Sequence, residues 1–256
     1  MIFSNLVDAN LNTDFIGRNL EYYSRLASTN DEAWELISEN VPNGSLIIAD
    51  NQFKGRGRFG KKWISAPSMG LTFSLILYDL KNLHRLPLII GVSVCEALKG
   101  FNFKLKLKWP NDIILNDKKI GGILCESKNI NNVKTIVVGI GMNINEKADD
   151  FPDNLRKRAI SLSMVSNKTF QRERVLAKIL NQFEKNLDLL GEKNLELFKK
   201  WESFCNHIDK EVTFHNNNVN VVGKFLKISD KGSAIIEVNN KEKAFSSGIV
   251  EINNSI

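Results

Sequence analysis

Gly55-Arg56-Gly57-Arg58-Phe59-Gly60-Lys61-Lys62-Trp63 places three glycines and four cationic residues within nine positions. The stretch follows Leu46-Ile47-Ile48-Ala49, an apolar run that is typical of a buried strand. Glycine lets backbone N–H groups approach an anion closely, and guanidinium groups donate paired, charge-assisted hydrogen bonds to phosphate or carboxylate oxygens. This composition favours a phosphate-binding loop, but it also occurs in flexible RNA-binding segments and in solvated basic turns. The loop alone therefore leaves the function open.

Three more dense elements follow the loop, and their order narrows the choice. They are Lys108-Trp109-Pro110-Asn111-Asp112, Lys119-Ile120-Gly121-Gly122-Ile123-Leu124 and Gly139-Ile140-Gly141-Met142-Asn143-Ile144-Asn145, with Ser28-Thr29-Asn30 upstream of the loop. In this order and spacing the elements resemble the biotin protein ligases. The resemblance runs from about Glu21 to the C-terminus. Each motif alone is unspecific, but the motifs together in this order are specific.

The resemblance implies an α+β fold. A mixed, mostly antiparallel sheet with flanking helices, like that of the class II synthetases and the biotin–lipoate ligases, would be followed by a small C-terminal SH3-like β-barrel. The expected domains are residues 1–206, which bind biotin and ATP, and residues 207–256, which form the barrel. The residue pattern agrees, because residues 104–126 have the alternation and tight turns of an antiparallel meander, and short strands separated by turns follow His207.

Local patterns predict the individual elements. Thr29 to Glu32 has a capping-box pattern and predicts a helix that begins there and continues to Ile37. Residues 145–168 read as mostly loop with a short helix. The remaining predictions are strands over 71–77, 135–141, 211–215, 219–228, 233–238 and 243–252, and helices over 86–98, 172–190 and a segment containing Leu195, Phe198, Trp201 and Phe204.

Composition excludes several classes of protein. The 256 residues are 43% hydrophobic and 25% charged, as in an ordinary globular domain, and they contain no membrane-length apolar run and no signal-peptide pattern. We therefore expect a cytoplasmic protein without a membrane partner. The three cysteines lack a Cys-x-x-Cys spacing, and the three histidines share no metal-ligand spacing. The net charge of +6 suits an anionic partner, but dispersed lysines favour a solvated surface.

By resemblance, the chain activates biotin with ATP and Mg²⁺ to form biotinyl-adenylate, and transfers biotin to a lysine of the biotin carboxyl carrier protein of acetyl-CoA carboxylase or a related carboxylase. The implied catalytic residues are Lys119, Arg58 and Asp112. Asp112 can bind Mg²⁺, orient Lys119 or assist deprotonation of the acceptor lysine, and its role stays open. No residue is assigned as a certain metal ligand.

The resemblance also implies the ligand contacts. The implied biotin-binding residues are Ser28, Thr29, Asn30, Gln52, Gly55, Arg56, Arg58, Lys119 and Gly122. The implied ATP- or adenylate-binding residues are Arg56, Arg58, Lys61, Trp63, Asn111, Lys119 and Asn143. Structural alternatives exist for some of them, since Ser28 and Thr29 can simply cap a helix, and Asp112 can stabilise a turn.

Three rival functions are considered. A lipoate or octanoate transferase of the same superfamily is nearest in chemistry, but the complete loop and the Lys108 to Asp112 element favour biotin. A biotin-responsive DNA-binding repressor needs a winged helix-turn-helix, and only 27 residues precede Ser28, so we expect no specific DNA binding. An RNA-binding barrel explains the charge but not the ordered motifs. A monomer and a homodimer are both compatible with the sequence.

Two departures from the family pattern accompany the resemblance. Lys61 and Lys62 stand where an arginine is common, which keeps the charge but loses the guanidinium fork. Ser246-Ser247-Gly248-Ile249-Val250 lacks the acidic residue that often follows the glycine. The contribution of the barrel to ligand binding is therefore left open.

Overall fold

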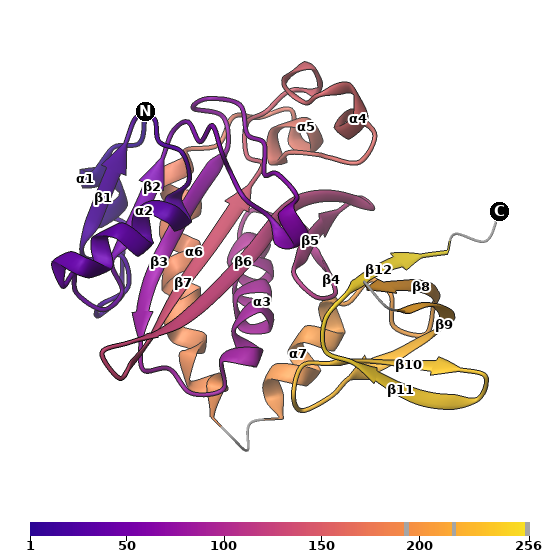
Figure 1. The fold of residues 1–256 in the computed structure, drawn as a ribbon. Helices are drawn as coiled ribbons and strands as arrows, with labels where there is room; N and C mark the ends of the chain where they lie inside the picture. The colour runs from indigo at the N-terminus through magenta and orange to yellow at the C-terminus, as the bar shows by residue number, and fades with distance from the viewer. Residues whose placement is uncertain (192–194, 217–218, 254–256) are drawn as a thin grey trace.

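A computed structural model describes residues 1–191, 195–216 and 219–253. Its centre is a seven-stranded sheet in the order β1-β2-β3-β7-β6-β5-β4 (Figure 1). Strands β1 and β2 pair in parallel, and every other neighbouring pair in this sheet is antiparallel. The predicted mixed, mostly antiparallel sheet is thereby confirmed. The strands are β1 (Leu20–Tyr23), β2 (Leu46–Ala49), β3 (Leu71–Tyr78), β4 (Lys106–Lys108), β5 (Asp112–Leu115), β6 (Lys118–Ile130) and β7 (Val133–Met142).

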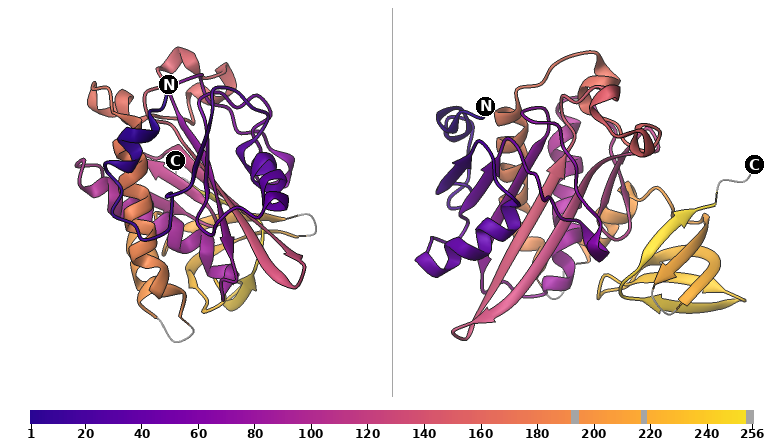
Figure 2. Two further views of the ribbon diagram at one scale, coloured as in Figure 1. Left: turned by 90° about the vertical axis from the view of Figure 1, so that its left-hand side faces the viewer. Right: turned by 45° about the horizontal axis from the view of Figure 1, so that its top comes forward.

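Helices cover both faces of this sheet, and strand alternation decides which residues meet which helix. Helices α3 (Leu86–Lys99) and α6 (Arg172–Asn186) lie on one face, and α2 (Thr29–Leu36) lies on the other (Figures 1 and 2). Val138 packs in the α3/α6 core, whereas Val137 packs with Ala33 of α2. The odd-numbered residues of β7 therefore face α2, and they include Gly139 and Gly141.

Shorter helical segments complete this part of the chain. They are α1 (Ser4–Asp8), η1 (Ile37–Glu39), η2 (Arg58–Gly60), η3 (Leu83–Arg85), η4 (Ala148–Asp150), α4 (Asp153–Arg156), α5 (Leu162–Ser166), η5 (Leu187–Leu190) and α7 (Glu196–Phe204). Among the described residues, none of the helices combines the length and the apolarity that a membrane span requires.

A second, five-stranded antiparallel sheet forms the C-terminal part, in the order β11-β10-β9-β8-β12 (Figure 1). Its strands are β8 (Glu211–Asn216), β9 (Val219–Ile228), β10 (Ala234–Val238), β11 (Lys241–Phe245) and β12 (Ile249–Ile252). The single strand predicted over 243–252 is wrong. Between β11 and β12 the chain crosses from one edge of the sheet to the other, and Gly248 passes against the ring of Phe214, where a Cβ would overlap it.

Three local predictions also need correction. Ser28, not Thr29, is the N-cap of α2, because its backbone is extended and its hydroxyl accepts from the Asp31 N–H at 3.5 Å. Residues 145–168 contain three short helical segments, η4, α4 and α5, not one. Leu195 is predicted to lie on the apolar face of the last helix, but α7 begins only at Glu196. The Leu195 side chain is 64% exposed and does not join the core. The other predicted elements are present, including the meander of β4, β5 and β6.

The two sheets meet around Trp109, which follows β4 and is 2% exposed. Its ring lies 6.3 Å from the ring of Phe214 in β8, and its Nε1–H donates to the carbonyl oxygen of Gly232 at 3.0 Å. Apolar residues of both sheets belong to one continuous core. The predicted domain boundary after residue 206 stays a prediction.

Candidate functional site

The glycine–arginine loop lies on the α2 face of the large sheet, over β6 and β7. Trp63, at the end of the loop, rests on Gly141: a Cβ at Gly141 would overlap the indole, and one at Gly122 would lie 3.7 Å from it. The indole Nε1 is buried and has no hydrogen-bond partner among the described residues. The loop, together with Gln52, lines a hollow of about 420 Å³. Gly122 and Gly141 form a floor of bare backbone beside it, the Trp63 indole lies against this floor as a roof, and we call the place where the indole covers the two glycines the slot.

Lys119 stands at one end of the slot. Its Nζ lies 2.5 Å from Oδ1 of Asp112, on the neighbouring strand of the meander. The position of a Cβ on Gly122 would be 3.3 Å from the same Nζ. The backbone of Lys119 is held by residues 158–160, since its N–H donates to Arg158 at 2.8 Å and its carbonyl accepts from Ile160 at 3.0 Å. The predicted pair of Lys119 and Asp112 is therefore assembled and fixed.

More cations surround this pair than Asp112 can neutralise. Burial lowers the pKa of Lys108, whose backbone pairs with that of Asp112 between β4 and β5; the charges of Asp112 and Glu251 raise this pKa in part, and those of Lys119 and Lys61 lower it. Burial also lowers the pKa of Arg58. An excess of positive charge in a partly buried site favours an anion with several charged oxygens.

Arg58 connects the loop to the C-terminal sheet. Its guanidinium donates to Asn111 Oδ1 at 3.4 Å, to the Ser247 hydroxyl at 3.2 Å and to the Gly248 carbonyl at 3.4 Å. Asn111 fixes its own side chain by donating to the carbonyl of Ile123 at 2.6 Å. Sequence reasoning noticed the unusual Ser246 to Val250 segment but did not predict this contact.

A buried polar chain lies at the start of α2. The Thr29 N–H and hydroxyl donate to Gln52 Oε1 at 2.7 and 3.1 Å, and Ser74 donates to both Thr29 Oγ1 and Asn30 Oδ1 at 2.7 Å. Ser28, Thr29 and Asn30 are each under 5% exposed. The predicted group of Ser28, Thr29, Asn30 and Gln52 is therefore brought together, and Ser74 joins it. Ser74 lay in a predicted strand but in no motif.

Arg56 extends away from this chain to two carboxylates that sequence reasoning missed. Its guanidinium binds both oxygens of Glu126, at 2.8 and 2.9 Å, and Oδ1 of Asp31 at 2.8 Å. Strand alternation from Gly122 would have placed Glu126 on the slot face of β6, but the sequence offers no signal for its partner.

Asn143 follows β7 and is 3% exposed. Its backbone N–H donates to Ile120 at 2.8 Å and its side-chain amide donates to Ile160 at 3.0 Å. Its Oδ1 is buried and accepts no hydrogen bond from any residue that the structure describes. One acceptor is thus fixed in place beside the segment that holds Lys119.

Comparisons with known proteins place this arrangement in a family. A model of the Biotin/lipoate A/B protein ligase family matches residues 22–143. The bifunctional ligase/repressor BirA of Bacillus subtilis is 35% identical over 248 residues, covering 94% of the chain and 76% of that protein. The chain belongs to the biotin protein ligase family. The members it is similar to are ligases, and the chain is therefore assigned to a family of enzymes.

Solved structures agree with this family assignment. The ligase is similar to the biotin protein ligase of Aquifex aeolicus, solved in complex with biotin and ATP, with 34% identity and a TM-score of 0.81. The similarity covers 93% of the ligase and 100% of that chain. The biotin--[acetyl-CoA-carboxylase] ligase of Paracoccus denitrificans is 34% identical over 47% of the ligase and 52% of its own length.

A dedicated metal cage is not evident in the ligase. Within the described ranges, no three His, Cys, Asp or Glu side chains are grouped so that they could hold a metal ion. Mg²⁺ in nucleotide sites is usually held by one or two carboxylates together with substrate phosphates. Asp112, which is partly exposed beside the cations, could be such a single carboxylate ligand.

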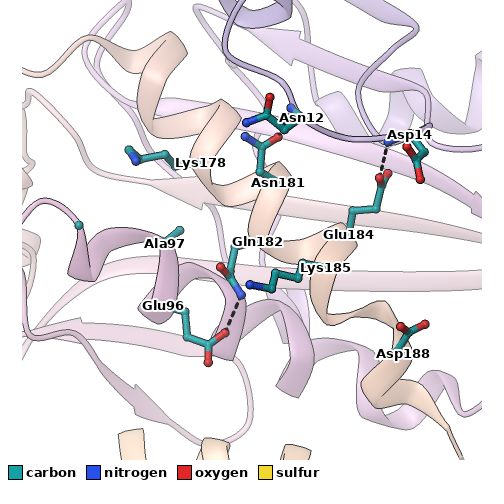
Figure 3. Close-up of a pocket in the computed structure, with 11 residues that line it drawn as sticks. Asn12, Asp14, Glu96, Ala97, Lys178, Asn181, Gln182, Glu184, Lys185 and Asp188 are labelled. Atoms are coloured by element: carbon teal, nitrogen blue, oxygen red, sulfur yellow. Dashed lines mark hydrogen bonds between the residues drawn. The ribbon is translucent and has the colours of Figure 1, made fainter.

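The ligase also has a polar groove of about 700 Å³ on the opposite face of the sheet, between α3 and α6 (Figure 3). Glu184 accepts from the backbone N–H of Asp14, and Gln182 donates to Glu96 at 2.9 Å. None of the predicted site residues lines this groove. The slot under Trp63 is therefore the candidate active site.

Proposed function

We propose that the ligase joins biotin to a lysine of a biotin carboxyl carrier protein in two steps, an adenylyl transfer followed by an acyl transfer. In the first step, a biotin carboxylate oxygen attacks the α-phosphorus of ATP, and the bond to the β-phosphate oxygen breaks to release pyrophosphate. In the second step, the amine of the acceptor lysine attacks the carbonyl of biotinyl-adenylate. An amide forms, AMP leaves, and the amine loses one proton.

The position of Lys119 at the end of the slot carries this proposal. Its ammonium group is aimed at the space where a carboxylate and an α-phosphate would meet, and it stabilises the negative charge that both bring. Asp112 holds Lys119 in place through the 2.5 Å contact. Once Trp63 moves away, a ring system can lie against the bare backbone of Gly122 and Gly141, because no Cβ occupies that floor.

The other end of the slot suits the ureido group of biotin, which offers two N–H donors and one carbonyl acceptor. Ser28, Thr29, Asn30 and Gln52 supply hydroxyl and amide groups that can bind both kinds of atom. Because Trp63 rests on the floor in this structure, biotin must lift it to enter. We expect the loop, including Gly55 and Arg58, to close again over the bound adenylate and exclude water.

The nucleotide is proposed to bind on the side of Lys119 away from α2. Asn143 Oδ1, which lacks a partner among the described residues, can accept from the adenine amino group. Lys61, Arg58 and Asn111 lie near the cationic end, where the phosphates would be. Asp112 is the residue that would help to hold Mg²⁺ here, and the ion would supply further positive charge.

Mass spectrometry of the purified ligase tests this assignment directly. The ligase is incubated with biotin, ATP and Mg²⁺, and then with a carboxyl carrier domain. We expect retained biotinyl-adenylate and a carrier domain heavier by one biotinyl group. Lys119→Ala should lower adenylate formation by at least about a hundredfold, as for loss of an oxyanion-stabilising group. The adjacent Lys118→Ala is the matched control and should retain it. Normal turnover by Lys119→Ala would remove Lys119 from the mechanism.

Lipoate or octanoate transfer is the alternative, because the matching family model includes lipoate ligases. These acids carry flexible chains and lack a ureido group. They offer no matching donors and acceptors to the polar chain at Ser28, Thr29, Asn30 and Gln52, and so give up the hydrogen bonds that a ureido group can make there. The buried polar end of the slot therefore favours biotin.

A further inference from the structure

Arg56 and Arg58 are two residues apart but bind at opposite ends of the slot. Arg58 contacts Asn111 and the C-terminal sheet near Lys119. Arg56 binds Glu126, seven positions beyond Lys119 on β6. The Nζ of Lys119 lies beside Gly122, four positions before Glu126, so at about 3.3 Å per strand residue the two points are roughly 13 Å apart along β6. The guanidinium of Arg56, bound to Glu126, is therefore held away from the point where Lys119 would stabilise the α-phosphate.

We propose that Glu126 is a positioning residue that fastens the glycine–arginine loop through Arg56. In this arrangement the Arg56 side chain acts on the loop and not on the reacting atoms. Its backbone, flanked by Gly55 and Gly57, is what the loop presents to the slot. The inference rests on the proposed function only in taking this loop as the cover of the biotin site.

The contacts of Glu126 distinguish it from an ordinary surface ion pair. Both of its oxygens bind Arg56, and Oε2 also accepts from Asn30 Nδ2 at 2.7 Å and from Trp34 Nε1 at 3.4 Å. Bidentate, further hydrogen-bonded pairs keep their geometry, whereas single exposed pairs often contribute little. Glu126 thus joins three elements: the loop, helix α2 and strand β6.

The surroundings of Glu126 favour its ionised form, which pairs with Arg56. Burial alone would raise the pKa of Glu126, but hydrogen bonds from Arg56 and Asn30 hold it below its ordinary value. Asp31 adds a second carboxylate to Arg56, with a single contact at 2.8 Å and greater exposure. Asp31 is therefore the weaker of the two anchors.

Limited trypsin digestion of the full chain tests the role of Glu126 without any ligand. The loop offers cleavage sites at Lys54, Arg56, Arg58, Lys61 and Lys62, and Glu126→Gln leaves all of them in place. When opening and closing are fast, cleavage follows the population of the open loop. We expect cleavage within residues 54–62 to rise about tenfold in Glu126→Gln, the loss expected for one charge-assisted bidentate contact. Asp31→Asn should give a smaller increase.

Glu35→Gln is the matched control, because Glu35 lies on the exposed side of α2 and takes part in no ion pair between described residues. Its loop cleavage should equal that of the unmodified chain. Cleavage at sites outside the loop reports global unfolding and should be unchanged in all three variants. Unchanged loop cleavage in Glu126→Gln would overturn the proposal, whatever Asp31→Asn does and whether or not the chain ligates biotin.

A double-mutant comparison separates positioning from direct ligand contact. Arg56→Gln and the double variant should shorten the half-life of bound biotinyl-adenylate by the same factor, because both remove the Arg56 link completely; Glu126→Gln alone should shorten it by the same or a smaller factor, because Asp31 still holds Arg56. A further shortening when Arg56→Gln is added to a chain that already carries Glu126→Gln and Asp31→Asn would mean that Arg56 contacts the ligand itself, and would contradict the proposal. If no adenylate forms in the unmodified chain, the proposed function fails, while the digestion still decides the role of Glu126.

Discussion

At the scale of the residue, a few side chains, and the absence of a side chain at two glycines, define the slot. Its floor exists because Gly122 and Gly141 lack a Cβ on the α2 face of the sheet, and its roof is one indole. Lys119 has a counter-ion and a fixed backbone, so its ammonium group is already oriented before ligand binds. Pre-orientation of this kind lowers the cost of assembling a charged transition state.

Gly141→Ala tests the floor of the slot. The added methyl group would overlap the Trp63 indole, and it would equally meet a ring system that lies against this floor. We expect the Kd for biotin, measured by titration calorimetry, to rise at least about tenfold, which corresponds to the loss of one good packing contact. Gly100→Ala, at the end of α3 where a Cβ has room, is the control. Unchanged biotin affinity in Gly141→Ala would place the ligand elsewhere.

Elements bring the motif residues together, and here the sequence was most informative. The meander of β4, β5 and β6, the buried strand β3 and helix α3 follow from alternation, turn residues and apolar runs. The structure brings Thr29 together with Gln52 and Asp112 together with Lys119, as the resemblance to biotin ligases groups them, and their roles stay predictions. Neither the residue patterns nor the resemblance predicted that Glu126 binds Arg56 or that Ser247 binds Arg58. These contacts join segments 70 and 189 positions apart, and no local pattern encodes such pairs.

The turn after β7 contains a carboxyl group that should make stability depend on pH. Glu146 is fully buried, its Oε2 accepts from Ile144 N–H at 2.7 Å, and burial raises its pKa to about 7. Because the folded-state pKa exceeds the unfolded one, the folded chain binds the extra proton, and this contribution to stability falls as pH rises from about 4.5 to about 7.

Glu146→Gln removes that titration. As pH rises from about 4 to about 8, the free energy of unfolding of the variant should increase relative to that of the unmodified chain, by up to roughly 3 kcal/mol. Urea denaturation of both proteins at the two pH values measures the difference. An equal difference between variant and unmodified chain at both pH values would show that folding does not raise the pKa of Glu146.

At the scale of the whole molecule, the C-terminal sheet is packed into the catalytic part and does not stand apart from it. Trp109 bridges the two, and Arg58 of the loop reaches Ser247 and Gly248 between β11 and β12. The contribution of the C-terminal sheet, which sequence reasoning left open, is therefore at least structural. It supplies hydrogen-bond acceptors for Arg58.

Trp109→Ala should destabilise both sheets together. The side chain is 2% exposed, so its removal leaves a large cavity at the junction, and losses of about 3–5 kcal/mol are typical. Trp109→Phe keeps most of the packing but loses the bond to Gly232, and it should cost about 1–3 kcal/mol. Urea unfolding followed by far-UV and near-UV circular dichroism should show one transition in each variant. Two separated transitions would indicate that the sheets unfold independently.

The most direct test of the central claim is ATP–pyrophosphate exchange by the purified ligase, without any acceptor protein. Biotin, lipoate and octanoate are compared at equal concentration in the presence of Mg²⁺. Exchange that depends on biotin alone is the predicted result, because only biotin matches the buried polar end of the slot. Exchange with lipoate or octanoate, or no exchange with any of the three acids, would contradict the assignment of this chain as a biotin-activating enzyme.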